Sequence, residues 1–133
     1  MVAEGAFVRV LFPTSEQPRA PGLVHICYCL AIRPPLALIA YTTTAPWPPG
    51  VPLPFGVRLF SQDEAIALNQ RRPFRLHMNR QARVVLSEKW FPDFNAPHQG
   101  VIAIAPARLR DELFAITIDL EKRNRLGVER LGL

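Results

Sequence analysis

The sequence is poor in lysine and cysteine, and it contains no long uninterrupted hydrophobic run. Among its 16 basic residues only Lys89 and Lys122 are lysine, so the other fourteen are arginine. Cys27 and Cys29 are two residues apart on one expected strand, a spacing that does not close a normal disulfide. The segment 33–35, Arg-Pro-Pro, interrupts the apolar stretches, so a membrane-spanning helix is not expected. The start also lacks a basic leader, and we therefore expect a cytoplasmic protein with reduced thiols.

What the chain does have is arginine within strand-like runs. With 133 residues, a net charge of +5 and a pI near 10, it reads as one basic domain, 1–133. Arg9, Arg58, Arg75 and Arg83 lie inside alternating apolar and polar segments. Guanidinium is planar and always charged, which suits bidentate contact with phosphate, so nucleic acid is the first candidate partner. An alternative is that GC-rich codons favour arginine and that these charges are merely solvated.

The hydrophobic pattern predicts a mainly β fold. We expect strands over 6–12, 22–33, 36–44, 56–60, 73–79, 82–87 and 101–105. Ser61 and Glu64 have the spacing of a capping box, which predicts a short helical insertion over 61–70. A C-terminal helix is expected at about 106–125, and a proline-rich loop is expected at 45–55. Without βαβ alternation, five to seven short strands indicate a small, strongly bent antiparallel sheet or barrel closed by one helix.

Several short motifs resemble those of one known family. They are Phe12-Pro13, Pro21-Gly22-Leu23-Val24, Ala40-Tyr41-Thr42-Thr43, Arg75-Leu76-His77, Trp90-Phe91-Pro92 and Gly100-Val101-Ile102. Over roughly residues 5–125 the chain is similar to the PemK/MazF family of toxin endoribonucleases. It departs from the family at two positions. Ala20 stands where an arginine normally precedes the proline, with Arg19 one residue earlier, and His77 replaces the aspartate of an Arg-x-Asp motif.

The resemblance implies a fold and a function. The fold would be a small SH3-like barrel with a C-terminal helix. The protein would form a homodimer whose subunits share an RNA groove, and it would cleave single-stranded RNA as an mRNA interferase without a metal or other cofactor. A small acidic antitoxin would be the protein partner that blocks the groove.

Four residues are the candidate catalytic groups. Arg75, His77 and Asn79 alternate along one expected strand, where Arg75 can hold the phosphate and His77 can act as base or acid near neutral pH. Arg19 is the candidate for stabilising the phosphorane, and the Thr42 hydroxyl is a candidate donor to a phosphate oxygen. The alternative for the strand is an ordinary solvated polar face, and the alternative for Thr42 is simple strand propensity.

A second set of residues is expected to contact the RNA backbone. These candidate RNA-binding residues are Arg9, Thr43, Arg58, Arg80 and Arg83. Trp47 and Trp90 either stack on bases or pack their loops onto the body of the domain. His25, Cys27 and Cys29 span too long a stretch of strand, about 13 Å at the usual rise, to close on one zinc ion, so no metal site is expected.

Other functions fit the same fold. One is a catalytically inactive barrel that binds nucleic acid or a protein partner, which the two departures at Ala20 and His77 favour. Another is a toxin that acts on a different target, such as a topoisomerase, through the same dimeric barrel.

Overall fold

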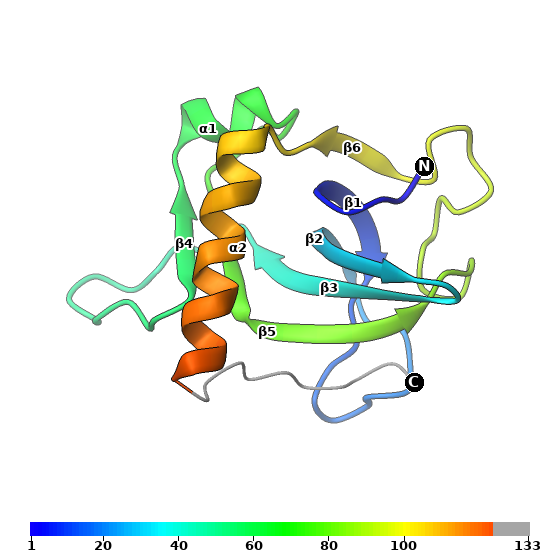
Figure 1. Ribbon diagram of the computed structural model, residues 1–133, viewed down its shortest axis with the longest axis horizontal. Helices are drawn as coiled ribbons and strands as arrows, with labels where there is room; N and C mark the ends of the chain where they lie inside the picture. The colour runs from blue at the N-terminus through cyan, green and yellow to red at the C-terminus, as the bar shows by residue number, and fades with distance from the viewer. Residues whose placement is uncertain (124–133) are drawn as a thin grey trace.

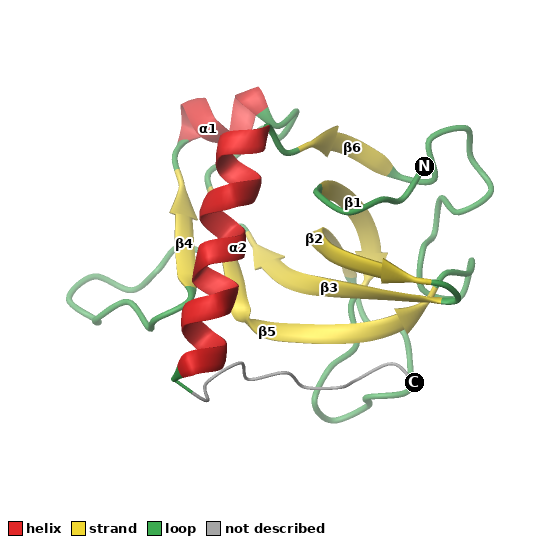
Figure 2. Cartoon of the chain, in the orientation of Figure 1, coloured by secondary structure: helices red, strands yellow, loops and turns green. Residues whose placement is uncertain are grey.

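The computed structural model describes residues 1–123, which form one curled antiparallel sheet with two helices (Figures 1 and 2). The strands are β1 (Ala6–Leu11), β2 (Val24–Arg33), β3 (Leu36–Thr43), β4 (Val57–Phe60), β5 (Phe74–Val85) and β6 (Val101–Ile104). Their order in the sheet is β4-β5-β3-β2-β1-β6, and every pair is antiparallel. The prediction of a mainly β fold with five to seven strands is confirmed, and the sheet has the form of a half-barrel.

Both faces of the sheet are covered by apolar side chains. The concave face carries one buried cluster, which includes Phe7, Leu76 and Met78 and packs against the C-terminal helix. The opposite face carries a second cluster, in which Trp90 and Phe91 from the loop after β5 cover the sheet. Side chains alternate between the two faces along each strand, which explains why β1 and β3 are apolar at nearly every position.

The two helices begin where the sequence predicts. Helix α1 (Gln62–Ala67) has a complete capping box, because the Ser61 hydroxyl accepts from the Glu64 amide and the Glu64 carboxylate accepts from the Ser61 amide. Helix α2 (Ala107–Lys122) starts after Pro106 and lies across the concave face of the sheet (Figure 1). The end expected near residue 125 lies outside the described residues. No helix among residues 1–123 is both long and apolar enough to cross a bilayer.

One prediction about the strands is wrong. Residues 73–79 and 82–87 were expected to be two strands, but they belong to the single long strand β5, which changes direction midway (Figure 1). On β3, Ala40 pairs with Gln81 and the next residue, Tyr41, pairs with His77, so residues 78–80 bulge out of the ladder. The buried Gln81 amide donates to the Met78 carbonyl at 2.8 Å across this bulge. A β-bulge bends its strand without ending it, which single-strand patterns do not reveal.

Candidate nucleic-acid interface

A row of aromatic rings crosses three neighbouring strands on the face opposite α2. The Tyr41 ring on β3 lies at its centre, 4.9 Å from the His25 ring on β2 and 5.5 Å from the His77 ring on β5. The Phe12 ring, at the end of β1, is 5.3 Å from Tyr41. These distances join side chains that are far apart in the sequence into one continuous row, in which the Phe12 ring is buried and the other three rings are partly exposed. We call this row, together with the guanidinium groups of Arg75 and Arg80 beside it, the aromatic-basic stripe.

The two arginines of the stripe lie over aromatic rings. The Arg80 guanidinium carbon is 4.3 Å from the centroid of the Tyr41 ring and 5.5 Å from that of Phe12. The Arg75 guanidinium carbon is 5.0 Å from the Trp47 ring of the proline-rich loop. Such contacts use the face of the guanidinium and hold the side chain in place.

The bulge in β5 decides which polar residues share this face. Strict alternation would place Asn79 beside Arg75 and His77, as the sequence predicted. Because residues 78–80 leave the ladder, Arg80 comes to the His77 face instead. Asn79 lies against Gly56, whose carbonyl accepts from the Met78 amide at 2.9 Å. The expected trio of Arg75, His77 and Asn79 is therefore corrected to Arg75, His77 and Arg80.

His77 is neutral at physiological pH in this setting. Burial, together with the smaller effect of the nearby positive charges of Arg75 and Arg80, lowers its pKa from 6.5 to about 4. The Nε2 atom of His77 is buried and has no hydrogen-bond partner among the described residues, and the same holds for the Arg75 Nε. The pKa of His25 is also lowered, mainly by burial, with Arg80 contributing. The site thus holds an uncharged imidazole between two cations.

The two predicted threonines lie on opposite faces. Thr43 pairs with Arg75 across the β3–β5 ladder and shares its face, and its hydroxyl accepts from the Ala45 amide at 3.2 Å. Thr42 faces the concave side, where its hydroxyl donates to the Ile26 carbonyl. The structure therefore does not bring Thr42 to Arg75 and His77.

Arg19 stands apart from the stripe. It is exposed in the loop between β1 and β2, and within residues 1–123 no hydrogen bond or ion pair holds it. The base of that loop is fixed, because a Cβ on Gly22 would lie 2.1 Å from the Phe12 carbonyl oxygen. The close approach of Gly22 thus anchors the loop beside the Phe12 ring of the stripe, while Arg19 itself points into solvent.

Three of the predicted RNA-contacting arginines have other neighbours. Arg58 forms ion pairs with Glu64, at 2.8 Å, and with Glu112, and it lies over the Phe60 ring. Arg9 forms an ion pair of 3.1 Å with Asp93. Arg83 lines a cavity at the far end of the sheet together with Arg33 and Glu121. Of the RNA-binding set, Arg80 and Thr43 lie in or beside the stripe.

The cysteines do not take part in this site. Cys27 and Cys29 are buried free thiols, and burial raises the pKa of both, to about 12 for Cys29. In the described part of the chain, no group of three or more His, Cys, Asp or Glu side chains is placed to hold a metal ion.

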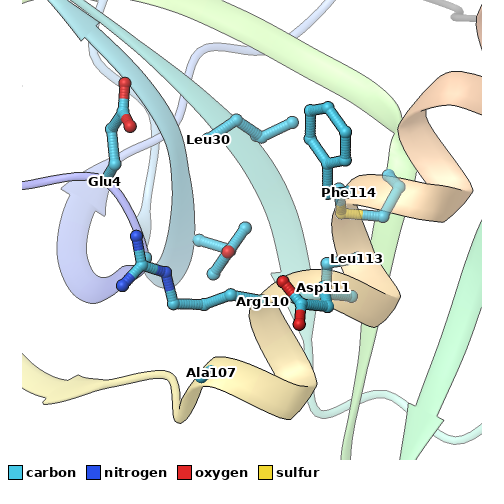
Figure 3. A pocket seen from close by; sticks show the side chains of 10 residues that line it. Glu4, Leu30, Ala107, Arg110, Asp111, Leu113 and Phe114 are labelled. Carbon is cyan, nitrogen blue, oxygen red and sulfur yellow. The ribbon is translucent and has the colours of Figure 1, made fainter.

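A separate cavity of about 360 Å³ opens between α2 and the N-terminal segment (Figure 3). Arg110 extends from α2 to within contact of the Gly5 backbone, and Leu30 and Phe114 line the other side. Glu4 and Asp111 also line the cavity, and their carboxylates offset the charge of Arg110. A lining of mixed charge does not favour a phosphate, so we leave this cavity outside the candidate nucleic-acid interface.

Sequence reasoning missed three members of the stripe, Tyr41, Phe12 and His25. Tyr41 and Phe12 were seen as parts of short motifs and His25 as a rejected metal ligand, but none was seen as a ring that joins the site. The only sequence feature that marks Tyr41 and Phe12 is an aromatic residue near a strand end, and such residues are common in sheets. The chain matches no model of a known protein family, and a search among curated proteins finds no significant match. The residues of the stripe are thus the main basis for a functional conclusion.

Proposed function

We propose that this protein is a metal-independent endoribonuclease for single-stranded RNA that acts as the toxin of a toxin–antitoxin pair. One observation carries the proposal: the partly exposed, neutral His77 ring lies between Arg75 and Arg80 on a face lined by aromatic rings. A base and two phosphate-binding cations at one place are the groups that metal-free RNA cleavage needs.

The reaction would use the 2′-hydroxyl of the RNA itself. Neutral His77 accepts the 2′-hydroxyl proton, the 2′-oxygen forms a bond to phosphorus, and the bond from phosphorus to the 5′-oxygen breaks. The leaving 5′-oxygen takes a proton from solvent, and the other product carries a 2′,3′-cyclic phosphate. Arg75 and Arg80 stabilise the extra negative charge of the phosphorane, a contribution typically worth about 10²–10³-fold per donor.

The low pKa of His77 fits this role once RNA is bound. In the free protein burial and, to a smaller extent, the two guanidinium groups hold the pKa of His77 down, which keeps the imidazole unprotonated and able to accept. A bound phosphodiester adds negative charge beside the ring and neutralises part of that effect. The pKa of His77 then rises toward neutrality, where a general base is most effective.

The aromatic rings account for the preference for single strands. Unpaired bases can reach the partly exposed rings of Tyr41, His25 and His77, while bases inside a duplex are covered by their neighbours. Stacking of this kind tolerates any base, so the stripe itself supplies affinity without sequence preference.

The partners in this proposal are a second copy of the chain and a small acidic antitoxin. The net charge of +5 supports an acidic partner that covers the stripe. Exposed apolar side chains in the proline-rich loop and on the edge strand β4 support a protein interface there; they are Val51, Leu53, Phe55 and Leu59.

Cleavage in the presence of a chelator tests the proposal. Purified protein is incubated with a mixed-sequence single-stranded RNA and excess EDTA, and the products are analysed for 2′,3′-cyclic ends. We expect cleavage by the wild type and a loss of about 10²–10⁴-fold in rate for His77→Ala. His98→Ala is the matched control, because His98 is an exposed loop residue, and it should cleave normally. Equal rates for both variants would remove His77 from the mechanism.

A non-catalytic RNA-binding module is the second candidate. It is favoured by the positions of Arg19 and Thr42, which the structure does not bring to His77. This reading predicts salt-dependent binding of RNA to the stripe without any cyclic-phosphate product. The product analysis described above, combined with a measurement of RNA binding at two salt concentrations, separates the two functions.

A further inference from the structure

A small cavity lies between the proline-rich loop and strands β4 and β5. Its volume is about 260 Å³. Cavities that bury a drug-sized ligand usually measure roughly 300–1,000 Å³, so this one suits a single flat ring system and not a larger ligand. Its lining combines apolar side chains with one guanidinium, and it includes Pro46, Trp47, Leu59, Phe74 and Arg75.

The exposed part of this cavity is on the same face of the sheet as the aromatic-basic stripe. Leu59 is 49% exposed and pairs with Arg75 across the β4–β5 ladder, and side chains directly opposite each other in a ladder share one face. The buried Phe74, from the opposite face, forms part of the inner wall. His77 follows Arg75 by two residues on the same face, roughly 7 Å further along the strand. An RNA phosphate held at Arg75 and His77 therefore lies beside the cavity.

Trp47 is held in the wall of the cavity by the loop itself. Its indole N–H donates to the Val51 carbonyl at 2.7 Å, and the Ala45 amide ties the start of the loop to the Thr43 hydroxyl at 3.2 Å. Trp47 is partly exposed, whereas Trp90, the other tryptophan of the chain, is buried. A ring that is held in place and still accessible can stack on a ligand with little loss of conformational freedom.

The lining selects an uncharged ring that is attached to an anion. Among the described residues that line the cavity, Arg75 alone is charged, and none carries a carboxylate. By contrast, carboxylates line the cavity beside Arg110 and the one beside Arg58. A nucleotide has the required combination, because its flat base accepts aromatic contacts and its phosphate accepts from a guanidinium. We infer that the cavity holds one unpaired nucleobase of the RNA, stacked on Trp47, next to the phosphate that Arg75 binds.

This inference rests on the proposed function, and it adds a fixed position for a base beside the scissile phosphate. The indole N–H of Trp47 is already bonded to the Val51 carbonyl, and the apolar side chains of the lining have no groups that read the edge of a base. The cavity therefore accepts any base. Its contribution is affinity and alignment without sequence preference.

The test removes one base at a time from an RNA that cannot be cut. A hexanucleotide of mixed sequence carries fluorine in place of its 2′-hydroxyls, and each of its derivatives lacks one base. For the wild type we expect the loss of the base that occupies the cavity to weaken binding by roughly 5- to 150-fold, the usual effect of one stacked base. In Trp47→Ala the same loss should weaken binding by less than about twofold, while bases that reach other rings keep their effect. Phe114→Ala is the matched control, because it removes an exposed ring beside the separate cavity at α2, and it should keep the wild-type pattern.

Each result decides the matter. If the wild type binds the RNA but every missing base has the same effect in Trp47→Ala, no base stacks on Trp47, which overturns the inference and leaves the proposed function standing. No RNA binding by the wild type overturns both. If Trp47→Ala does not fold, as judged by circular dichroism, Trp47→Leu keeps the apolar bulk and removes the flat ring. That variant should lose the effect of the same base, and an unchanged effect overturns the inference.

Discussion

The arginines of the sheet fall into two groups that meet different neighbours. Arg9 and Arg58 form ion pairs with carboxylates at the edges of the domain. Arg75 and Arg80 lie over aromatic rings on the face opposite α2. Arg9, Arg58 and Arg75 occur in similar alternating segments of the sequence, so nothing local separates Arg75 from the other two. The difference arises from which strands and helices the fold places beside each one.

The two groups of arginines differ in which part of the guanidinium makes the contact. A guanidinium paired with carboxylates uses its in-plane N–H donors on those partners, as Arg58 does with Glu64 and Glu112. A guanidinium stacked on a ring contacts it through its face, and the planar group is of a shape that suits bidentate contact with phosphate. We therefore expect the first group to stabilise the fold and the second to bind RNA.

Among substitutions of the arginines, the largest effect should come from Arg75→Ala. Removing this guanidinium takes away a donor to the phosphorane, so the rate of RNA cleavage should fall by about 10²–10³-fold. The midpoint of urea unfolding should change little, since no ion pair holds Arg75 within residues 1–123. Rates are measured with single-stranded RNA under single-turnover conditions.

Arg83→Ala is the matched control for Arg75→Ala. Arg83 is on the same strand, β5, and is also partly buried, but it lies at the far end of the sheet with Arg33 and Glu121. Its cleavage rate should remain close to that of the wild type. If Arg83→Ala loses as much activity as Arg75→Ala, the division of the arginines into two groups is wrong.

The next effect should come from Arg58→Ala, and it should appear in stability. The change leaves Glu64 and Glu112 without their shared cation and removes the contact with Phe60. We expect the free energy of unfolding to fall by about 1–3 kcal/mol, the usual cost of losing hydrogen bonds to a charged partner. RNA cleavage per folded molecule should persist.

Arg108→Ala is the control for Arg58→Ala, because it removes one positive charge without removing the ion pairs of Arg58 or its contact with Phe60. Arg108 is an exposed residue that lines the same cavity as Arg58. Its replacement should change the free energy of unfolding by no more than about 0.5 kcal/mol, as for most surface substitutions. Equal destabilisation by both variants would mean that overall charge, and not the ion pairs of Arg58, matters.

The sequence predicted most of the fold, because its signals are local. Alternation located the strands, Ser61 and Glu64 marked the start of α1, and Leu109, Leu113, Ile116 and Leu120 marked the buried stripe of α2. The bend in β5 escaped prediction, because a bulge depends on the pairing of Tyr41 with His77 across strands. A residue on one strand does not reveal its partner on another.

The candidate site was less predictable for the same reason. Arg75 and His77 were predicted as site residues because they alternate along one strand, which is a local feature of the sequence. The arrival of Arg80 on their face depends on the bulge, and the contacts of Tyr41 with His25 and His77 depend on the order of three strands. The cavity beside Trp47 depends on how the proline-rich loop meets β4 and β5.

The smallest effect should be a dependence of stability on pH that originates at His77. Its pKa is about 4 in the folded protein and about 6.5 in an unfolded chain. Between these values the unfolded chain binds more protons, so stability is fully present above pH 6.5 and is lost as the pH falls toward 4. We expect a loss on the order of 1 kcal/mol between pH 7 and pH 5, less than the full shift implies, because the ring is only half-buried.

Urea unfolding of the wild type and of His77→Asn at the two pH values isolates this contribution. His77→Asn should be the less pH-dependent of the two, since it removes the group that takes up a proton on unfolding, and His98→Asn should follow the wild type. Because Arg75 and Arg80 lower the pKa of His77, Arg80→Ala should also weaken the pH dependence. An equally steep loss of stability in His77→Asn would show that the pH dependence does not originate at His77, and an unchanged pH dependence in Arg80→Ala would show that this stacked arginine does not act on the ring.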